Sequence, residues 1–274
     1  MEYKILVLDL DGTLTNGRKE ITQHTKDVLF KAQEQGLRIV LASGRPTYGI
    51  VPLANELRIG DYGGCILSFN GGQIIDWCTK EVIYENVLDT NIYPYLYTCA
   101  KENGFEILSY KDELIISENA ENPYIQHESF LNKMECRNVD NFLDVIKFPV
   151  PKCLIVGEPQ QLELLECKMR DALNGRMNVF RSEPFFLELV PNGIDKACSL
   201  KVLLDHLGMS HEQMIAIGDG FNDVSMIKYA GLGVAMSNAQ EAVKKEADYI
   251  TLSNEEDGVA AVVEKFILKK DEKK

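Results

Sequence analysis

The sequence predicts an α/β fold: a doubly wound parallel-sheet core with a second, α+β unit inserted in the chain. The chain opens on four consecutive apolar residues at positions 5–8, a pattern typical of a strand buried on both faces of a parallel sheet. Helix and strand patterns then alternate to about residue 84, and the same alternation returns near residue 190. Strand patterns dominate between these two borders, which indicates a separate unit.

The first and last segments carry the signals of alternating strands and helices. Thr22 is a suitable N-cap for a helix that ends near Gln35, and Gly36 closes that helix. Pro46 suits the first turn of a helix that follows the second strand. We expect strands at 37–42, 65–69, 73–75, 214–217, 232–235 and 249–252, and later helices at 196–207, up to 229, at 239–246 and up to about 268.

The inserted segment has a different texture. We expect a helix over about 91–103, a hairpin of strands at 105–110 and 114–117, and a strand at 153–156. An amphipathic helix over 160–173 and two strands at 178–181 and 185–190 follow. The stretch 123–151 shows no regular pattern and carries no assignment.

The composition limits the classes of protein to consider. No apolar run approaches the ~20 residues of a membrane span, and the opening lacks the features of a signal peptide. The seven cysteines are an odd number with no Cys-x-x-Cys pair, which indicates reduced thiols in a cytoplasmic protein. The net charge of −13 disfavours nucleic acid and anionic membranes as partners and leaves the oligomeric state open. A phosphorylated substrate would be repelled too, so its site must supply local positive charge.

Two aspartates directly follow the opening strand. Asp9 and Asp11 flank Leu10 at the carboxyl end of that strand, where open α/β sheets bind their ligands. Gly12 permits a sharp turn there, and Thr13 offers a hydroxyl and a backbone N–H. Two carboxylates are costly to bury without a counter-charge, so a metal ion is their expected partner. The alternative is an ordinary turn, in which Asp and Gly are common.

A second acidic segment lies toward the carboxyl end of the chain. Gly218-Asp219-Gly220-Phe221-Asn222-Asp223 ends a buried strand and opens a helix, so its carboxylates face the same edge of the sheet as Asp9. Because Mg²⁺ prefers oxygen ligands, we expect Asp219 and Asp223 in a metal site that Asn222 supports. The alternative is a turn with a helix N-cap.

Two further segments offer hydrogen-bond donors and positive charge. Ser43 and Gly44 end the second strand, where a hydroxyl and N–H groups can bind a phosphoryl oxygen without net charge. Arg45 is a further candidate for the same site. Lys196 begins a helix, where a cation is unfavourable for the helix dipole, and this position indicates another duty. The alternatives are an N-cap serine, a solvated arginine and an exposed lysine.

Together these segments resemble four motifs of the haloacid dehalogenase (HAD) superfamily. Asp9-Leu10-Asp11-Gly12-Thr13 resembles the first motif, and Ser43 resembles the second. Gly193-Ile194-Asp195-Lys196 resembles the third, with Ala197 where the family often has glycine, and the segment 218–223 resembles the fourth. The whole chain resembles the Cof-like subfamily, whose members have a Rossmann-like core and an α/β cap inserted between the second and third motifs.

The resemblance implies a role for each candidate residue. Asp9 would be the nucleophile, Asp11 the general acid and base, and Lys196 the cation that neutralises the transition state. The implied metal is Mg²⁺, held by Asp9, the backbone carbonyl of Asp11, Asp219 and, through water, Asp223. The implied substrate-binding residues are Gly12, Thr13, Ser43, Gly44, Arg45, Asn70 and Asn222.

The resemblance also implies a whole protein: a cytoplasmic Mg²⁺-dependent phosphatase that hydrolyses small phosphate monoesters, typically sugar phosphates, through an aspartyl-phosphate. Residues 1–84 and 190–274 would form the core, and residues 85–189 a cap that closes over the site and selects the leaving group. A sugar phosphomutase would use the same intermediate. A non-catalytic protein that binds a sugar phosphate is the second alternative.

Overall fold

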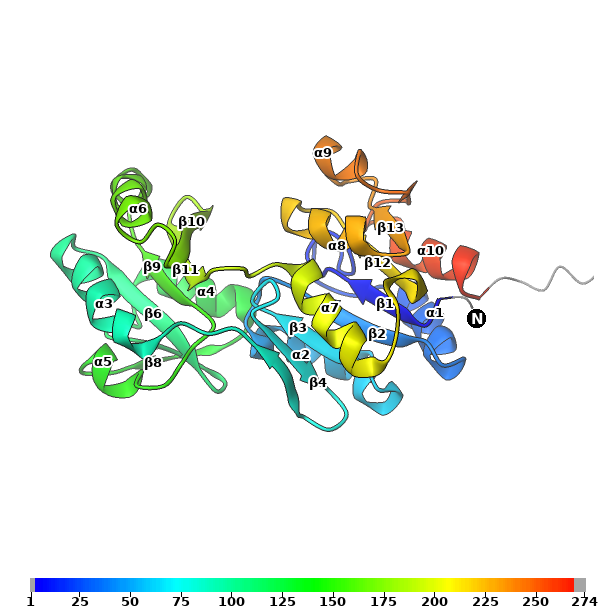
Figure 1. The fold of residues 1–274 in the computed structure, drawn as a ribbon, viewed down its shortest axis with the longest axis horizontal. Coiled ribbons are helices and arrows are strands. Elements are labelled where there is room, and N and C mark those ends of the chain that lie inside the picture. The colour runs from blue at the N-terminus through cyan, green and yellow to red at the C-terminus, as the bar shows by residue number, and fades with distance from the viewer. Residues whose placement is uncertain (1–2, 269–274) are drawn as a thin grey trace, which may run out of the picture. The chain divides into compact units, whose positions relative to one another are not determined.

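The computed structural model describes residues 3–268, and the chain divides into two compact units (Figure 1). The first unit comprises Met1–Tyr84 and Asp195–Lys274, and the second comprises Glu85–Ile194. The second unit is therefore an insertion, and its carboxyl border at Ile194 lies five residues beyond the expected residue 189. Each unit has a hydrophobic core of its own.

The first unit is built on an eight-stranded sheet in the order β14-β13-β12-β1-β2-β3-β4-β5. The pairings from β14 to β3 are all parallel, and β3 pairs with β4 in the antiparallel direction. The strands are β1 (Ile5–Leu8), β2 (Arg38–Ala42), β3 (Cys65–Ser68), β4 (Gln73–Asp76), β5 (Val82–Glu85), β12 (Met214–Gly218), β13 (Leu232–Ala235) and β14 (Tyr249–Ile250). The chain winds outward from β1 in both directions, which confirms the expected doubly wound architecture.

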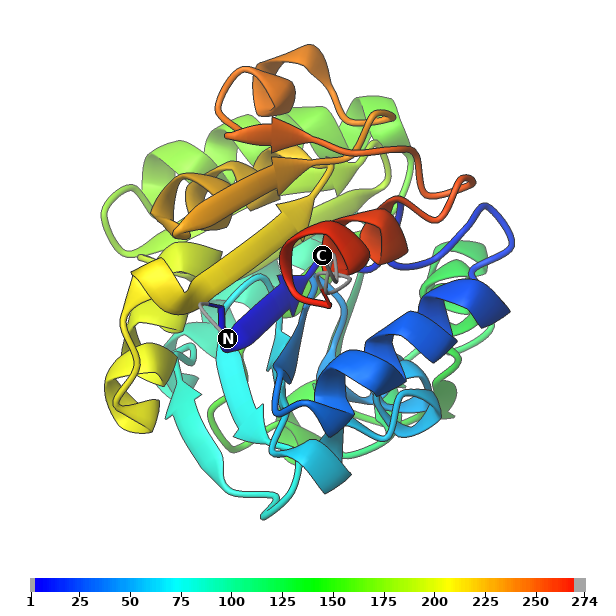
Figure 2. The ribbon, with the colours of Figure 1, turned by 90° about the vertical axis from the view of Figure 1, so that its right-hand side faces the viewer.

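The packing of strand β1 explains why its residues are all apolar and do not alternate between apolar and polar. Leu6 and Leu8 belong to one hydrophobic cluster, Ile5 and Val7 belong to another, and all four residues are fully buried. The first cluster includes helices α1 (Gln23–Glu34), α2 (Thr47–Glu56) and α10 (Gly258–Phe266), and the second includes α7 (Lys196–Leu207). Figure 2 shows α1 and α10 on one side of the strands and α7 on the other. A strand covered on both faces must be apolar at every position.

Local signals fix several helix ends. The Thr22 hydroxyl accepts a hydrogen bond from the N–H of Thr25 and caps α1, as predicted. Helix α7 spans the predicted range and ends at Gly208, whose φ of 63° few other residues adopt. The remaining helices of this unit, α8 (Val224–Tyr229) and α9 (Glu241–Lys244), are short. Helix α9 and strand β14 are both shorter than the sequence predicts, and β5 was not expected.

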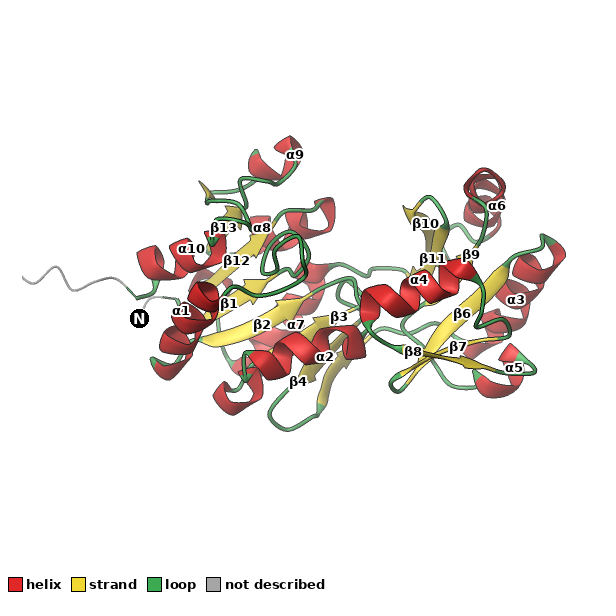
Figure 3. Cartoon of the chain, turned by 180° about the vertical axis from the view of Figure 1, so that it is seen from behind, coloured by secondary structure: helices red, strands yellow, loops and turns green. Residues whose placement is uncertain are grey.

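The second unit contains a six-stranded sheet in the order β10-β11-β9-β6-β7-β8 (Figure 3). Its pairings are antiparallel except that of β7 with β8. Its elements are α3 (Tyr93–Glu102), β6 (Glu106–Lys111), β7 (Leu114–Ser117), α4 (Pro123–Asn132), β8 (Glu135–Asn138), α5 (Phe142–Val145), β9 (Cys153–Val156), α6 (Pro159–Ala172), β10 (Met177–Glu183) and β11 (Phe186–Pro191). Elements α4, β8 and α5 occupy the stretch for which the sequence carried no assignment.

Candidate active site

The parallel strands of the first unit bring distant segments of the chain to one edge of the sheet. Asp9 directly follows β1, Ser43 follows β2, and Asp219 follows β12. These three strands are neighbours and run in the same direction, so their carboxyl ends lie side by side. This edge is where open α/β sheets bind their ligands.

A buried lysine joins two of the expected aspartates. The Lys196 ammonium donates hydrogen bonds to Asp9 Oδ1 at 2.8 Å, to Asp223 Oδ1 at 2.6 Å and to the carbonyl of Ala42 at 2.9 Å. The Lys196 side chain is fully buried, and its three donors are all used. Helix α7 begins at Lys196, so its first turn presents this cation to the strand ends. The unfavourable interaction between this cation and the helix dipole is offset here by its ion pairs with two carboxylates.

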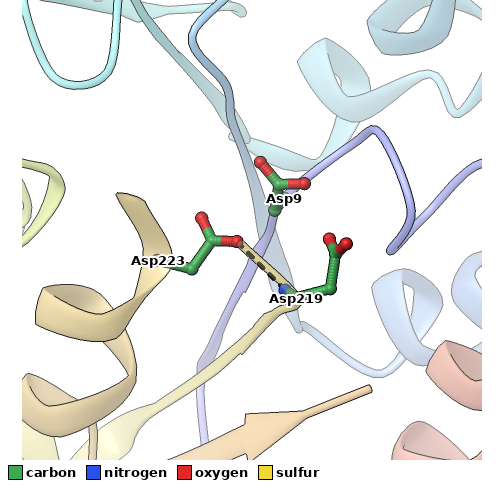
Figure 4. Close-up of side chains that lie close together, drawn as sticks. All are labelled: Asp9, Asp219 and Asp223. Carbon is green, nitrogen blue, oxygen red and sulfur yellow. Dashed lines mark hydrogen bonds between the residues drawn. The ribbon is translucent and has the colours of Figure 1, made fainter. Parts of the chain in front are cut away.

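Three carboxylates lie close together at this edge of the sheet (Figure 4). Asp9, Asp219 and Asp223 each offer an oxygen, and these oxygens lie within 4.8 Å of one another. The second oxygen of Asp223 accepts hydrogen bonds from the N–H groups of Asp219, at 3.0 Å, and Gly220, at 2.9 Å. The turn of the second acidic segment therefore holds its own carboxylate in place.

The cluster is short of positive charge. Burial raises the pKa of Asp9 well above its ordinary value, and the neighbouring Asp223 raises it further against the opposing effect of Lys196. Burial also raises the pKa of Asp219, and the hydrogen bond from Thr13 acts in the opposite direction. One lysine faces three carboxylates, and hard oxygen donors at this spacing fit a divalent cation such as Mg²⁺. Asp9, Asp219 and Asp223 are therefore the side chains that could hold such an ion.

Gly12 and Thr13 both contact Asp219. The Thr13 hydroxyl donates a hydrogen bond of 2.8 Å to Asp219 Oδ1, so it orients a carboxylate of the cluster. Gly12 has a φ of 86°, and a Cβ atom at this position would lie 2.4 Å from Asp219 Oδ2. Glycine is required here both by the backbone conformation and by the close approach of the carboxylate.

Asp11 has surroundings unlike those of the other aspartates. Arg45 donates from Nε to Asp11 Oδ2 at 2.8 Å and from a terminal nitrogen to Oδ1 at 2.6 Å, and Lys19 donates to Oδ1 at 2.7 Å. Burial alone would raise the pKa of Asp11, but the hydrogen bonds and charges of Arg45 and Lys19 hold it below its ordinary value. The sequence gives no sign of Lys19, a charged residue in an irregular loop.

The turn after β3 lies against the segment after β2. The backbone N–H of Asn70 donates to the carbonyl of Ser43 at 2.9 Å, and the N–H of Arg45 donates to the Ser43 hydroxyl at 3.2 Å. The Asn70 side chain accepts a hydrogen bond of 3.0 Å from the Asn222 amide and lies close to Gly44. Asn70 has a φ of 56°, a conformation that asparagine tolerates better than most residues.

Comparison with known proteins identifies the family. The family model for haloacid dehalogenase-like hydrolases matches residues 6–263. The chain belongs to this family. It is similar to a haloacid dehalogenase-like hydrolase from Bacteroides thetaiotaomicron, with 60% identity and a TM-score of 0.94 over 96% of this chain and 99% of that one. This HAD-like hydrolase is thus a phosphatase-type enzyme of the Cof-like group, as its motifs predict.

Two further proteins resemble the hydrolase over nearly the whole chain. The 5-amino-6-(5-phospho-D-ribitylamino)uracil phosphatase of Bacillus subtilis is 29% identical over 269 residues, which cover 98% of this chain and 97% of that protein. A sugar phosphatase of HAD subclass IIB has a TM-score of 0.77 at 24% identity, covers 96% of this chain and 98% of its own, and shares the fold.

The predicted site residues of this hydrolase all lie in its first unit. They are Asp9, Asp11, Gly12, Thr13, Ser43, Gly44, Arg45, Asn70, Lys196, Asp219, Asn222 and Asp223. Hydrogen bonds link ten of them into two groups, one around Lys196 and Asp219 and the other around Asp11 and Asn70. The other two, Gly12 and Gly44, lie against the side chains of Asp219 and Asn70. Within residues 3–268, no helix combines the length and apolar character that crossing a bilayer requires.

Proposed function

We propose that this hydrolase is a cytoplasmic, Mg²⁺-dependent phosphatase that cleaves small phosphate monoesters, chiefly sugar phosphates, through an aspartyl-phosphate intermediate. The observation that carries the proposal is the fully buried Lys196 ammonium between Asp9 and Asp223. A structural ion pair would need one carboxylate, whereas this lysine faces a cluster that also needs a cation. The named activities of the two relatives, on a phosphoribityl compound and on sugar phosphates, support the substrate class.

The first chemical step belongs to Asp9 and Asp11. A carboxylate oxygen of Asp9 forms a bond to phosphorus while the bond between phosphorus and the ester oxygen breaks. Asp11 donates a proton to the departing oxygen, which leaves as an alcohol. Lys196 favours the ionised form of Asp9, orients its carboxylate, and offsets negative charge that develops beside it. Asp9, Asp219 and the Asp11 carbonyl, with Asp223 through water, would hold Mg²⁺, which would add positive charge near the phosphoryl group.

The second step returns the enzyme to its starting state. Asp11 accepts a proton from water, the water oxygen bonds to phosphorus, and the bond to Asp9 breaks to release inorganic phosphate. Asp11 is ionised at the start of this step because it gave up its proton in the first step. In the first step Asp11 must carry a proton, and its pairing with Arg45 disfavours that protonated form. We therefore expect the phosphoryl group of the substrate to compete with Asp11 for Arg45.

The remaining groups bind the phosphoryl group and choose the substrate. We assign phosphoryl binding to the Ser43 hydroxyl, the N–H groups of Gly12, Thr13 and Gly44, and the side chains of Asn70 and Asn222. None of these residues lies in the inserted unit Glu85–Ile194, and we assign to that unit the choice of leaving group. The seven cysteines, all free, are consistent with a cytoplasmic location.

The test is phosphate release from a panel of sugar phosphates, nucleotides and small phosphorylated acids, with Mg²⁺ and with a chelator. The proposal expects Mg²⁺-dependent release concentrated on sugar phosphates, and none from Asp9→Asn in a folded protein. Conversion of a hexose 1-phosphate into an isomeric sugar phosphate would show a phosphomutase instead. Tight binding without turnover would show a binding protein. Normal release by Asp9→Asn would exclude the aspartyl-phosphate.

A further inference from the structure

The loop between β1 and α1 carries Asp11 and Thr13, and side chains from two other loops hold its backbone. The Asn238 amide donates a hydrogen bond of 2.8 Å to the carbonyl of Gly12. The Asn254 amide donates one of 2.9 Å to the carbonyl of Thr15. Both asparagines lie more than 220 residues further along the chain than the carbonyls they bind.

The two asparagines also bind each other. The backbone N–H of Asn254 donates to Asn238 Oδ1 at 3.1 Å, so both ends of the Asn238 amide are used. This pairing allows one orientation of the amide, because its oxygen must accept while its nitrogen donates. A third hydrogen bond holds the same loop two residues after Thr15: the N–H of Gly17 donates to the Glu255 carboxylate at 2.7 Å.

Asn238 lies between two segments of the candidate site, the end of β12 next to Asp219 and the loop that carries Asp11 and Thr13. Its own loop is bonded to the end of β12, where the N–H of Met236 donates to the carbonyl of Gly218 at 3.1 Å. Its side chain reaches the other segment, since the carbonyl of Gly12 belongs to the peptide bond that joins Gly12 to Thr13. Asn238 thus spans from the strand end that carries Asp219 to the loop that carries Asp11.

The location of these bonds argues for a role beyond stability. The Asn238 side chain is exposed, and a hydrogen bond there adds little to the free energy of folding. Gly12, by contrast, lacks a Cβ atom, so the peptide bond that follows it can take orientations that other residues would restrict. A donor fixed on the carbonyl of Gly12 removes that freedom next to Asp11 and Thr13.

We propose that Asn238, supported by Asn254, is a positioning residue that fixes the loop of Asp11 and Thr13 in its reactive arrangement. The inference rests on the proposed function, because a reactive arrangement implies turnover. Its structural half, that the amide orders this loop, does not depend on turnover.

Two substitutions and a matched control test the proposal in the full-length enzyme. Asn238→Ala removes both bonds of the amide, whereas Asn238→Asp keeps the acceptor for Asn254 and turns a carboxylate toward the Gly12 carbonyl. Asn103→Ala is the control, because this exposed asparagine also donates to a carbonyl, that of Cys99 at 2.8 Å in the second unit. We expect both Asn238 variants to lower kcat by about 10- to 100-fold with KM changed less than about threefold.

Amide hydrogen exchange gives a readout that needs no activity. We expect faster exchange of the N–H groups of residues 13–17 in both Asn238 variants and in Asn254→Ala, with the wild-type rate in Asn103→Ala. The midpoint of thermal unfolding should stay within a few degrees of the wild type. Unchanged exchange in the Asn238 variants would overturn the ordering role. Faster exchange with unchanged kcat, or a loss of kcat that follows the loss of thermal stability, would overturn the positioning role. A wild-type enzyme without phosphate release would refute the proposed function, and the exchange data would still decide the ordering role.

Discussion

The guanidinium group of Arg45 binds both carboxylate oxygens of Asp11, at 2.8 Å and 2.6 Å. Such a bidentate pair has stronger and more directional hydrogen bonds than a single contact. The Arg45 side chain is 15% exposed, whereas Lys19, the other partner of Asp11, is 51% exposed. Arg45 is therefore the main cation that sets the protonation state of Asp11.

Replacing Arg45 should raise the pKa of Asp11. The depressed pKa of this carboxyl stabilises the fold above its unfolded pKa, and that contribution is lost as the pH falls through the lower, folded value. Arg45→Met should remove the contribution, so the variant loses less stability than the wild type below about pH 4. Carboxyl-carbon NMR titration of metal-free protein measures the pKa directly. Lys19→Met is the control and should give a smaller rise, and an equal rise in both variants would contradict the ranking.

Loss of Lys196 should leave an uncompensated pair of buried carboxylates. We expect Lys196→Met to cost about 3–5 kcal/mol of stability in metal-free protein and to lower kcat by at least about 100-fold. Two carboxylates raise the pKa of Lys196 against the opposing effect of burial, so its contribution persists below the ordinary lysine pKa and is lost only above it. The lysine's own contribution therefore stays present from about pH 6 to about pH 9, and the loss in the variant should grow with pH as the uncompensated Asp9 carboxyl ionises.

Substitution of a second buried lysine distinguishes a loss of stability from a loss of catalysis. Lys152 pairs with Glu188 at 3.1 Å in the inserted unit, and both side chains are nearly buried. Lys152→Met should lower the midpoint of thermal unfolding as Lys196→Met does, while hydrolysis of a small aryl phosphate keeps most of its kcat. Equal losses of kcat in the two variants would show that Lys196 acts through stability alone.

Mg²⁺ should stabilise the folded protein, and more so at higher pH. The raised pKa values of Asp9 and Asp219 mean that the fold disfavours their ionised forms, so metal-free stability falls as pH rises from the unfolded toward the folded pKa. A divalent cation reverses this cost and should contribute about 2.7 kcal/mol when its concentration is 100 times its Kd. Thermal unfolding with Mg²⁺ and with a chelator measures the effect. Asp219→Asn should abolish the difference and the exposed Asp144→Asn should keep it, and a difference that survives Asp219→Asn would place the ion elsewhere.

Alanine substitutions at two glycines with similar φ values distinguish the effect of backbone strain from the effect of displacing a carboxylate. Gly12 and Gly36 have φ values of 86° and 93°, but an added Cβ meets Asp219 Oδ2 at 2.4 Å in the first case and nothing within 4 Å in the second. Alanine should cost roughly 1–2 kcal/mol of backbone strain at either position. Gly12→Ala should in addition weaken Mg²⁺ binding by at least about tenfold, measured by calorimetry. Similar Mg²⁺ affinity in both variants would show that Asp219 can move without loss.

Local patterns in the sequence determined the core and its end points. The unbroken apolar run of β1 requires a strand covered on both faces, and that strand leads directly into Asp9. Thr22 and Gly208 mark helix ends because capping and positive φ are properties of single residues. The spacing of the acidic segments placed Asp9, Asp219 and Asp223 at one edge, because the ends of neighbouring parallel strands coincide.

Only the tertiary structure decided the features that depend on contacts between distant segments. Helix α4 has no apolar periodicity that would predict it, because two of its three buried positions, Glu128 and Asn132, are polar. Glu128 is buried because it accepts a hydrogen bond from Tyr110. The hydrogen bonds from Arg45 and Lys19 to Asp11 could not be predicted from the sequence. The residues next to a cation in the chain do not show whether its side chain points into solvent or folds back onto a distant carboxylate. Periodicity and capping are encoded over a few residues, whereas the partners of a charged or amide side chain are set by which loops the fold brings together.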